Sequence, residues 1–444
     1  MKNISKKPVV VRKRPASAGP TLGVEEARAK VGPARLAALE ILLAVGANQG
    51  HSDELLHSER VDALSPEDRN LTTALVMGVL RWQIALDARV RGLLQRPEQR
   101  LAEPVAVALR MGAFQLLHLD RIPAHAALSE SVELCRAAGE PHATGMVNAV
   151  LRKVAADKPM SQNRDMGHPI FESVMKFAER LGHPRWMVER WAAVYGRDAA
   201  LAICEADQRE HGAGSMFAET DETASLPVMD DGSRLVAELA AAALPAVEGR
   251  AARIWDCCAA PGGKTLVLAL RAAGAEVVAT DVSAKRLAQM QARLKRYTYA
   301  ERVQCSVSDA AVVKGDVGLF DLILCDVPCS GTGTLAENPE IRHRLKPEEL
   351  ARQAERQKKI LEGALKRLAP GGRLVYSTCS LEPEECKRVV DSVAGLRRID
   401  VEPLLDGLAL QMETASMVRD GALRTLPGMH GCDGFFAVVL ERVG

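Results

Sequence analysis

The chain has 444 residues, of which 47% are hydrophobic and 26% charged, and its formal net charge is +1. This length allows two or three domains, and the composition is that of an ordinary soluble globular protein. The balanced charge excludes a strongly basic overall surface, and an aromatic share of 3% argues against a binding face of stacked rings. Any basic surface must therefore be local.

The N-terminal residues contain no apolar segment of the kind that a signal peptide needs, so we expect a cytoplasmic protein whose ten cysteines are reduced. No two cysteines are spaced as C-x2-C, and we therefore expect no zinc site. The most apolar stretch, residues 235–247, is interrupted by Glu238 and Pro245 and is too short to span a bilayer. We expect no contact with a membrane.

Residues 1–32 are rich in Lys and Arg and contain no acidic residue before Glu25. Pro, Ser and Gly are interspersed, which predicts a disordered basic arm. Such an arm suits contact with RNA phosphates and suits a solubilising tail equally well.

Residues 33–157 show helical periodicity throughout, with short turns between the helices. In one segment Ser65 is the expected N-cap, Pro66 stands in the first turn and Asp68 follows three residues after the cap. Apolar residues then recur at helical spacing: Leu71, Leu75, Val79 and Trp82. The pattern predicts an all-α bundle.

Residues 158–232 are predicted to form a linker. Two amphipathic helices, at 168–182 and 183–196, place Trp186 and Trp191 on a packed face. The polar and acidic stretch 213–232 is expected to be a loop.

Residues 233–444 change in character. Short apolar runs suited to buried parallel strands alternate with helical segments, which predicts a doubly wound, Rossmann-like α/β domain with ligands at the carboxyl ends of its strands. The runs are "ARIWDCC", "AEVVATDV", "RVQCSV", "LFDLILCDV" and "GGRLVYSTC".

The loop "DCCAAPGGKT", residues 256–265, follows the first of these strands. A phosphate-binding P-loop would need glycine where Cys258 stands, and the dinucleotide pattern G-x-G-x-x-G is absent. An S-adenosylmethionine site remains. Asp281 ends the second strand, where it suits either a ribose contact or a helix N-cap, and Asp309 follows the third strand, where it suits the adenine amino group.

Two cysteines follow neighbouring strands of this predicted sheet: Cys329 in "CDVPCSGTGT" and Cys379 in "YSTCSLEPEE". One such cysteine is often buried and structural, but two at adjacent strand ends point to chemistry. A thiolate that adds to C6 of cytosine makes C5 nucleophilic enough to accept a methyl group. Asp326 is a candidate to meet the base near N3, and Lys264 is a candidate to lower a thiol pKa.

These segments, together with "QKKIL" and the terminal "DGFF", resemble the Sun/Fmu family of RNA cytosine-C5 methyltransferases. The resemblance implies that Cys379 is the covalent nucleophile and that Cys329 assists release of the product. It also implies a set of S-adenosylmethionine contacts: Cys258, Ala259, Ala260, Pro261, Gly262, Gly263, Lys264, Asp281, Asp309 and Asp326.

The N-terminal bundle narrows this expectation. "RIPAHAALSESVELC" and "GMVNAVLRK" are similar to the NusB-like domain of the bacterial 16S rRNA member, which implies RNA binding or docking to a protein. The expected organisation is a basic arm (1–32), an all-α NusB-like RNA-binding domain (33–157), a helical linker (158–232) and a methyltransferase domain (233–444).

Two departures from the family concern RNA. The RRM-like module that usually precedes the catalytic core is shortened or missing, because "DDGS" (230–233) follows only a short loop. His343 stands where an aromatic residue is usual, and the neighbouring Arg342, Arg344 and Lys346 suit an RNA-facing loop or a solvated helix lead-in equally.

The sequence therefore predicts a monomeric enzyme that makes 5-methylcytosine in 16S rRNA at a flipped or single-stranded base. One alternative is the same reaction on tRNA or 23S rRNA, since the core motifs would be identical. Another is a NusB-type RNA-binding adaptor with an inert methyltransferase half.

Overall fold

The computed structural model describes residues 22–157, 174–209, 216–218, 225–312 and 318–442. The chain divides into two compact units, each described here by itself. The first unit comprises Met1–Val79 and Leu86–Asn163, and the second comprises Leu80–Ala85 and Arg164–Gly444.

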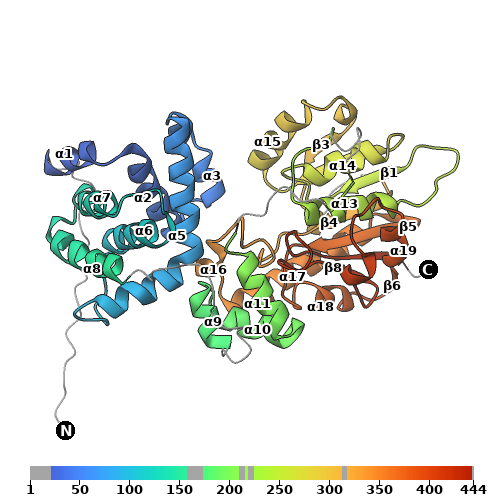
Figure 1. Ribbon diagram of the computed structural model, residues 1–444. Coiled ribbons are helices and arrows are strands. Elements are labelled where there is room, and N and C mark those ends of the chain that lie inside the picture. Colours follow the sequence, from blue (N-terminus) through green and yellow to red (C-terminus); the bar gives the residue numbers. More distant parts are fainter. Residues whose placement is uncertain (1–21, 158–173, 210–215, 219–224, 313–317, 443–444) are drawn as a thin grey trace, which may run out of the picture. The chain divides into compact units, whose positions relative to one another are not determined.

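The first unit is helical throughout its described part (Figure 1). Its longest helix begins as predicted, because the Ser65 hydroxyl accepts a hydrogen bond from the Asp68 amide at 3.1 Å. The helices are α1 (Leu22–Lys30), α2 (Pro33–Gly46), α3 (Ser52–Leu56), α4 (Glu59–Asp62), α5 (Pro66–Leu93), α6 (Glu103–His118), α7 (Ala124–Ala137) and α8 (Thr144–Ala156). Within α5, residues Leu80–Ala85 are assigned to the second unit. The predicted all-α bundle is confirmed.

Helix α1 lies within the segment that the sequence predicts to be disordered. Ala27 and Val31 are 4% and 6% exposed, and the Gly32 amide donates to the Glu130 carboxylate at 3.1 Å. The prediction of disorder is therefore wrong for Leu22–Lys30, which forms a helix whose Ala27 side chain, like Val31 just after it, is buried. The rest of the predicted arm, residues 1–21, lies outside the described residues.

The second unit begins with short helices: α9 (Val174–Arg180), α10 (Arg185–Tyr195) and α11 (Arg197–Ala206). They surround an apolar cluster that includes Trp191, which is 1% exposed, with Trp186 packed against it. The predicted packing of both tryptophans is confirmed. Between α11 and α13 (Asp231–Ala242), the described residues form one isolated bridge, Phe217 to Leu410, and no strand. Residues 158–173, 210–215 and 219–224 lie outside the described part, so a missing RRM-like module stays a prediction.

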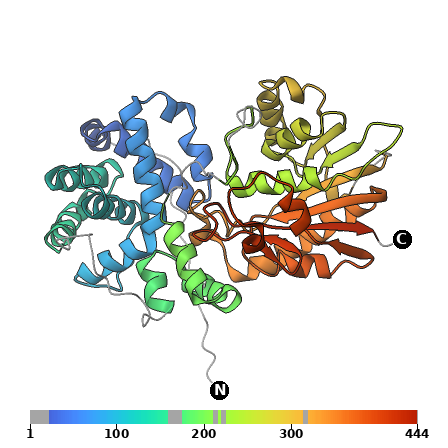
Figure 2. The same cartoon turned by 45° about the vertical axis from the view of Figure 1, so that its right-hand side comes forward.

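A nine-stranded sheet organises the rest of this unit, in the order β3-β2-β1-β4-β5-β9-β8-β7, with β6 also paired to β9 (Figures 1 and 2). The five predicted strands are present and parallel: β1 (Arg253–Asp256), β2 (Glu276–Asp281), β3 (Gln304–Val307), β4 (Phe320–Asp326) and β5 (Leu368–Thr378).

The antiparallel part of the sheet was not predicted. It consists of β6 (Leu396–Ile399), β7 (Val418–Arg419), β8 (Ala422–Arg424) and β9 (Phe436–Arg442). Strands β6, β7 and β8 have two to four residues and carry too little periodicity to be recognised, whereas β9 is a seven-residue run that the sequence-based prediction missed. The fold is thus Rossmann-like with a mixed sheet.

Helices cover both faces of the sheet. Alternate residues of β4 point to opposite sides, so Leu322 and Leu324 pack with α13 and α14 (Gly263–Arg271), whereas Ile323 and Cys325 pack with α17 (Pro347–Leu365) and α18 (Lys387–Asp391). The other helices are α15 (Ala284–Leu294), α16 (Ile341–Arg344) and α19 (Glu402–Asp406). Burial on both faces explains why the parallel strands are continuous apolar runs.

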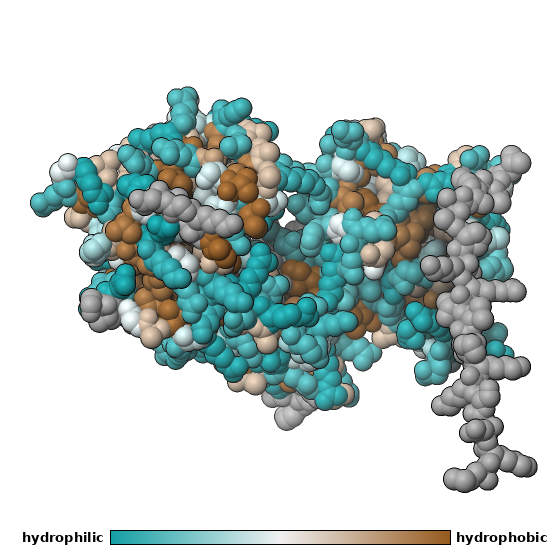
Figure 3. Space-filling view, turned by 180° about the vertical axis from the view of Figure 1, so that it is seen from behind, coloured by the Kyte–Doolittle hydropathy of each residue, from teal (hydrophilic) through white to brown (hydrophobic). Residues whose placement is uncertain are grey.

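The surface is mixed in character. The face seen in Figure 3 is mostly hydrophilic, with apolar side chains in separate small patches. Among the helices of the described residues, none has the length and apolar character required to cross a membrane.

Candidate active site at the carboxyl edge of the sheet

The carboxyl ends of the parallel strands meet at one edge of the sheet and carry acidic residues. Asp256, Asp281 and Asp326 are the last residues of β1, β2 and β4. Because β4 and β5 are direct neighbours, with Asp326 paired to Ser377, the loops after these two strands begin side by side. This register brings together the two cysteines that the sequence singles out.

The sulfur atoms of Cys329 and Cys379 lie 3.2 Å apart. Both residues are free thiols and both are partly exposed. The two loops are also joined through the backbone, since the Gly333 amide donates to the Cys379 carbonyl at 2.8 Å. The predicted juxtaposition of the two thiols is confirmed.

The surroundings of Cys379 raise its thiol pKa well above the ordinary value. The largest cause is the hydrogen bond that it shares with Cys329, followed by burial and by the negative charge of Asp326. Lys264 acts in the opposite direction but is outweighed. Lys264 therefore lowers the Cys379 pKa, as expected from the sequence, but not enough to bring it below the ordinary value.

Lys264 and Asp326 form an ion pair beside the thiols, with 2.8 Å between Nζ and Oδ2. Burial disfavours the charged amine, but Asp326 more than compensates and the Lys264 pKa is raised. Lys264 also donates to the Ser233 hydroxyl, and the Ser377 hydroxyl donates to Asp326, both at 2.8 Å. Both charged groups are thus held in fixed positions next to the sulfur atoms.

A cavity of about 130 Å³ adjoins this ion pair. Its lining includes most of the predicted cofactor contacts: Cys258, Ala259, Ala260, Pro261, Gly263, Lys264 and Asp326. Gly262 has a φ of +95° at the start of α14, where a Cβ atom would lie 2.8 Å from Met290. Glycine is therefore required at this turn.

Asp256 also lines the cavity, although the sequence analysis gave it no role. It is 1% exposed, and burial raises the pKa of its carboxyl to about 7, against the hydrogen bond from Thr265. Oδ2 accepts that bond at 2.6 Å, whereas Oδ1 has no hydrogen-bond partner among the described residues. A buried carboxyl oxygen without a partner beside a cavity suits a polar ligand group. The position of Asp256 at the carboxyl end of a predicted strand could have identified it as a candidate from the sequence.

The other two predicted cofactor carboxylates are not among the residues that line this cavity. Asp281 is 4% exposed and accepts from the Ala260 and Ser283 amides at 3.3 and 2.8 Å. The alternative prediction, that Asp281 is a helix N-cap, is wrong, because Ser283 is the N-cap of α15 (Ala284–Leu294). Asp309 is exposed and accepts from the Ala311 amide at 3.0 Å.

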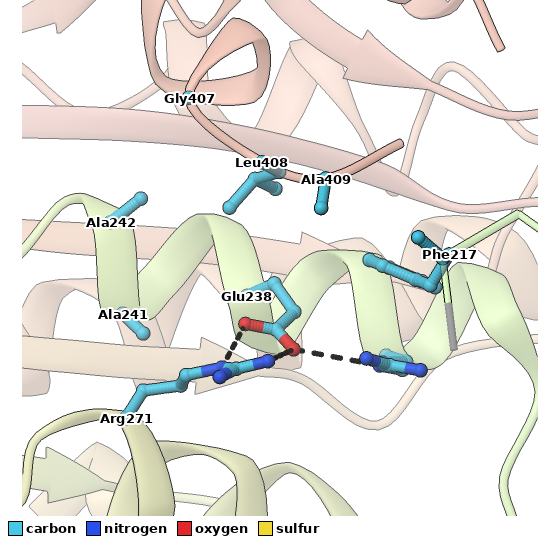
Figure 4. A pocket seen from close by; sticks show the side chains of 10 residues that line it. Phe217, Glu238, Ala241, Ala242, Arg271, Gly407, Leu408 and Ala409 are labelled. Carbon is cyan, nitrogen blue, oxygen red and sulfur yellow. Dashed lines mark hydrogen bonds and ion pairs between the residues drawn. The ribbon is translucent and has the colours of Figure 1, made fainter. Parts of the chain in front are cut away.

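A larger cavity, of about 410 Å³, contains none of the predicted residues (Figure 4). Its charged group is Glu238, which accepts two hydrogen bonds from Arg271, at 2.7 and 2.9 Å, and one from Arg234 at 3.5 Å. Phe217, Leu408 and Ala409 contribute apolar surface. The carboxylate is neutralised by two guanidinium groups, so this cavity lacks the reactive groups of the smaller one.

Both interpretations of Arg342, as part of an RNA-facing loop and as part of a solvated helix lead-in, are wrong. Arg342 is 2% exposed and donates to the carbonyls of Arg81 and Asp207, both at 2.7 Å and both within the second unit. These carbonyls compensate the buried guanidinium only in part, because its Nε has no hydrogen-bond partner among the described residues and burial lowers the pKa of Arg342 to about 10. His343 is half-buried and contacts the Leu80 carbonyl at 2.8 Å, whereas Lys346 is exposed.

Comparison with known families gives a match to each unit. A family model described as 16S rRNA methyltransferase RsmB/F matches residues 242–441, and a model of the NusB family matches residues 32–156.

Curated relatives match over nearly the whole length. The chain is 33% identical to a ribosomal RNA small subunit methyltransferase B of Xanthomonas campestris, over 92% of this chain and 97% of that protein. It is 30% identical to a probable ribosomal RNA small subunit methyltransferase B of Bacillus subtilis, over 92% and 98% respectively.

Among solved structures, one described as the crystal structure of PH0851 superposes with a TM-score of 0.68 at 20% sequence identity. The match covers 93% of this chain and 99% of that one. At this identity the likeness concerns the fold alone.

Proposed function

The chain belongs to the RsmB/F family of 16S rRNA methyltransferases, and from this membership we propose that it methylates C5 of cytosine in 16S rRNA through a covalent adduct with Cys379. This membership is consistent with the family that the sequence motifs resemble. The observation that carries the proposal is the pair of thiols 3.2 Å apart, beside the Lys264–Asp326 ion pair.

In the proposed reaction, Cys379 reacts as a thiolate and its sulfur bonds to C6 of the base. Electron density moves to N3, where, in this scheme, a proton from the Lys264–Asp326 pair neutralises the charge that forms. C5 then takes up the methyl group. Loss of the C5 proton, assisted by Cys329, lets the sulfur–C6 bond break and restores the aromatic ring.

The cofactor in this proposal is S-adenosylmethionine, which supplies an electrophilic methyl group. The residues present fit this group: Asp256, whose Oδ1 has no hydrogen-bond partner among the described residues, lines the cavity together with residues of the loop from Cys258 to Gly263. Val282, which follows Asp281, is 56% exposed and offers apolar surface for a ring beside that carboxylate. In the proposal the loop, Asp281, Asp309 and Asp326 hold the cofactor against the thiols.

The proposed substrate is RNA, with the target cytosine in a single-stranded or flipped conformation. Partly exposed thiols at a sheet edge cannot reach a ring atom inside a base stack. The NusB-family match over residues 32–156 supports a role for the first unit in binding RNA. In this proposal, the chain organisation is the one that the sequence predicts, except that Leu22–Lys30 belongs to the helical unit, and RNA contacts are also supplied outside the catalytic domain.

The test is a covalent-trapping experiment. The protein is incubated with 16S rRNA and S-adenosylmethionine, and denaturing gels are used to detect a protein–RNA adduct. Cys379→Ala should form no adduct and no 5-methylcytosine. Cys329→Ala should accumulate the adduct, because it forms but is released slowly. Methylation of C5 by the Cys379→Ala protein would overturn the proposal.

Two controls complete this experiment. Cys325→Ala removes a thiol of the same sheet that is fully buried, and it should behave as the unaltered protein. Bisulfite mapping of 16S rRNA, 23S rRNA and tRNA from a deletion strain distinguishes the proposed substrate from the alternatives. A modification lost only from 23S rRNA or tRNA would contradict the assignment to 16S rRNA.

A further inference from the structure

Behind the two thiols lies a buried carboxylate, Glu385, which is 0% exposed and precedes α18. Its Oε1 accepts from the Ser330 amide and from the Gln357 side-chain amide, both at 2.9 Å. Its Oε2 accepts from the Ser380 hydroxyl at 2.6 Å and also from the Ser330 hydroxyl. One carboxylate thus collects four donors from three separate elements.

These donors bracket both thiols along the chain. Ser330 directly follows Cys329, and Ser380 directly follows Cys379. The two serine hydroxyls also lie 3.1 Å apart. On the other side of Cys329, the Gln357 side chain donates to the Pro328 carbonyl at 3.0 Å. Each of the two cysteines is therefore followed directly by a serine that is hydrogen-bonded to Glu385.

The carboxylate has no obvious value for stability alone. All four of its donors are uncharged, and burial of a carboxylate without a cation costs free energy that a well-packed apolar residue would avoid. Its hydrogen-bonding capacity is nevertheless fully used, which fixes its position. A fully bonded anion shared by two loops is suited to hold those loops in register.

Other contacts would keep the two loops folded without this carboxylate. The Leu381 amide donates to the Thr332 hydroxyl at 2.9 Å, and the Gly333 amide donates to the Cys379 carbonyl at 2.8 Å. The Tyr376 hydroxyl contacts Glu385 through its backbone carbonyl, at 2.7 Å, which a side-chain substitution leaves in place.

We propose that Glu385 is a positioning residue, which sets the separation of the Cys329 and Cys379 sulfur atoms by tethering the serine after each of them. Its effect on methyl transfer rests on the proposed function, whereas its effect on thiol geometry does not. Glu385 itself touches neither thiol in this scheme and acts through Ser330 and Ser380.

Thiol geometry is measured first, by disulfide formation. In this reaction both thiols lose their protons and together give two electrons to added diamide, which becomes the hydrazine. Peptide mass mapping then follows the Cys329–Cys379 bond. Because a disulfide forms only within narrow geometric limits, Glu385→Ala should form it at least about 10-fold more slowly. Glu385→Gln should fall between, because the glutamine oxygen retains two donors and the serine hydroxyls can reorient.

Methyl-transfer kinetics give the second measurement. Misplacement of reacting groups by about 1 Å costs on the order of 100-fold in rate, so kcat of Glu385→Ala should fall by up to about 100-fold. KM for RNA should change little, since the substituted side chain is buried away from the substrate. Ser380→Ala, which removes one tether, should show a smaller loss in the same direction.

Glu382→Gln is the matched control. Glu382 belongs to the same segment and is also 0% exposed, but its carboxylate binds Arg190 at 2.7 Å and Trp191 at 3.0 Å. This variant should form the disulfide at the original rate. Circular dichroism shows whether each variant is folded.

The outcomes separate the two proposals. A folded Glu385→Ala protein that forms the disulfide as fast as the unaltered chain would overturn the positioning role. Slow disulfide formation in that variant, together with C5 methylation by Cys379→Ala, would leave the positioning role standing and remove the proposed function.

Discussion

The methyltransferase domain contains two pairs of cysteines whose sulfur atoms are the same distance apart. Cys257 and Cys325 are separated by 3.2 Å, as are Cys329 and Cys379. The first pair, however, is 1% and 0% exposed and belongs to an apolar cluster between the sheet and α17. The second pair is partly exposed at the edge of the sheet, where charged groups surround it.

This difference shows that proximity of two thiols does not by itself make a reactive site. Burial is the largest cause of the raised pKa of Cys325; Asp256 and Asp326 add to it, and no cation is among its causes. Cys379 has Lys264, Asp326 and Cys329 as electrostatic neighbours, so its ionisation can respond to each of them. Substitutions in the two pairs should therefore have opposite consequences for activity and stability.

The largest expected effect concerns activity. Cys379→Ala should lower methyl transfer to RNA by at least about 1,000-fold, because the covalent route is lost. Cys325→Ala should leave the rate nearly unchanged. Single-turnover transfer of a labelled methyl group measures both. Equal losses in the two variants would mean that the pairs do not differ in function.

The second effect concerns the thiol pKa. The hydrogen bond with Cys329 is the largest cause of the raised Cys379 pKa, so Cys329→Ala should lower that pKa. The thiolate is the reactive form, and each unit of pKa decrease gives about 10-fold more thiolate at a pH below the pKa, which makes alkylation faster. Iodoacetamide labelling of Cys379 from pH 7 to 10 tests this. An unshifted profile would contradict the coupling.

The third effect concerns the charges beside Cys379, and the two substitutions should change its labelling rate in opposite directions. Asp326→Asn removes a negative charge that raises the Cys379 pKa, so labelling of Cys379 at pH 8 should become faster, by a few-fold. Lys264→Gln removes the opposing charge and should make it slower. Labelling of Cys325 under the same native conditions should not respond to either substitution, because its thiol is buried. Changes of the same sign in both variants would refute the electrostatic account.

The smallest expected effect concerns stability. Cys325→Ala deletes a fully buried sulfur atom from a packed cluster and should lower the free energy of unfolding by about 1 kcal/mol. Cys379→Ala should cost less, because that side chain is partly exposed. Urea unfolding followed by circular dichroism compares the two. A larger loss in Cys379→Ala would contradict this order.

Much of the site was predictable because its residues follow recognisable strands. The apolar runs identified β1 to β5, and the loops after β4 and β5 contained Cys329 and Cys379. The short strands β6, β7 and β8 escaped prediction because they carry too little periodicity, and the longer β9 was missed as well. Arg342 was misjudged because a basic residue in a polar segment looks solvated until its carbonyl partners are known.

The sequence by itself determined the two domains' classes, the parallel strands and the chemical identity of the thiols, since these follow from local periodicity and residue type. The tertiary structure added the distance between these thiols and the charged and buried groups around them. Their arrangement depends on the pairing of β4 with β5, on the Lys264–Asp326 ion pair and on Glu385 behind both loops. The burial of a thiol and the charges around it depend on residues that are distant in the chain. No local sequence pattern can therefore predict them.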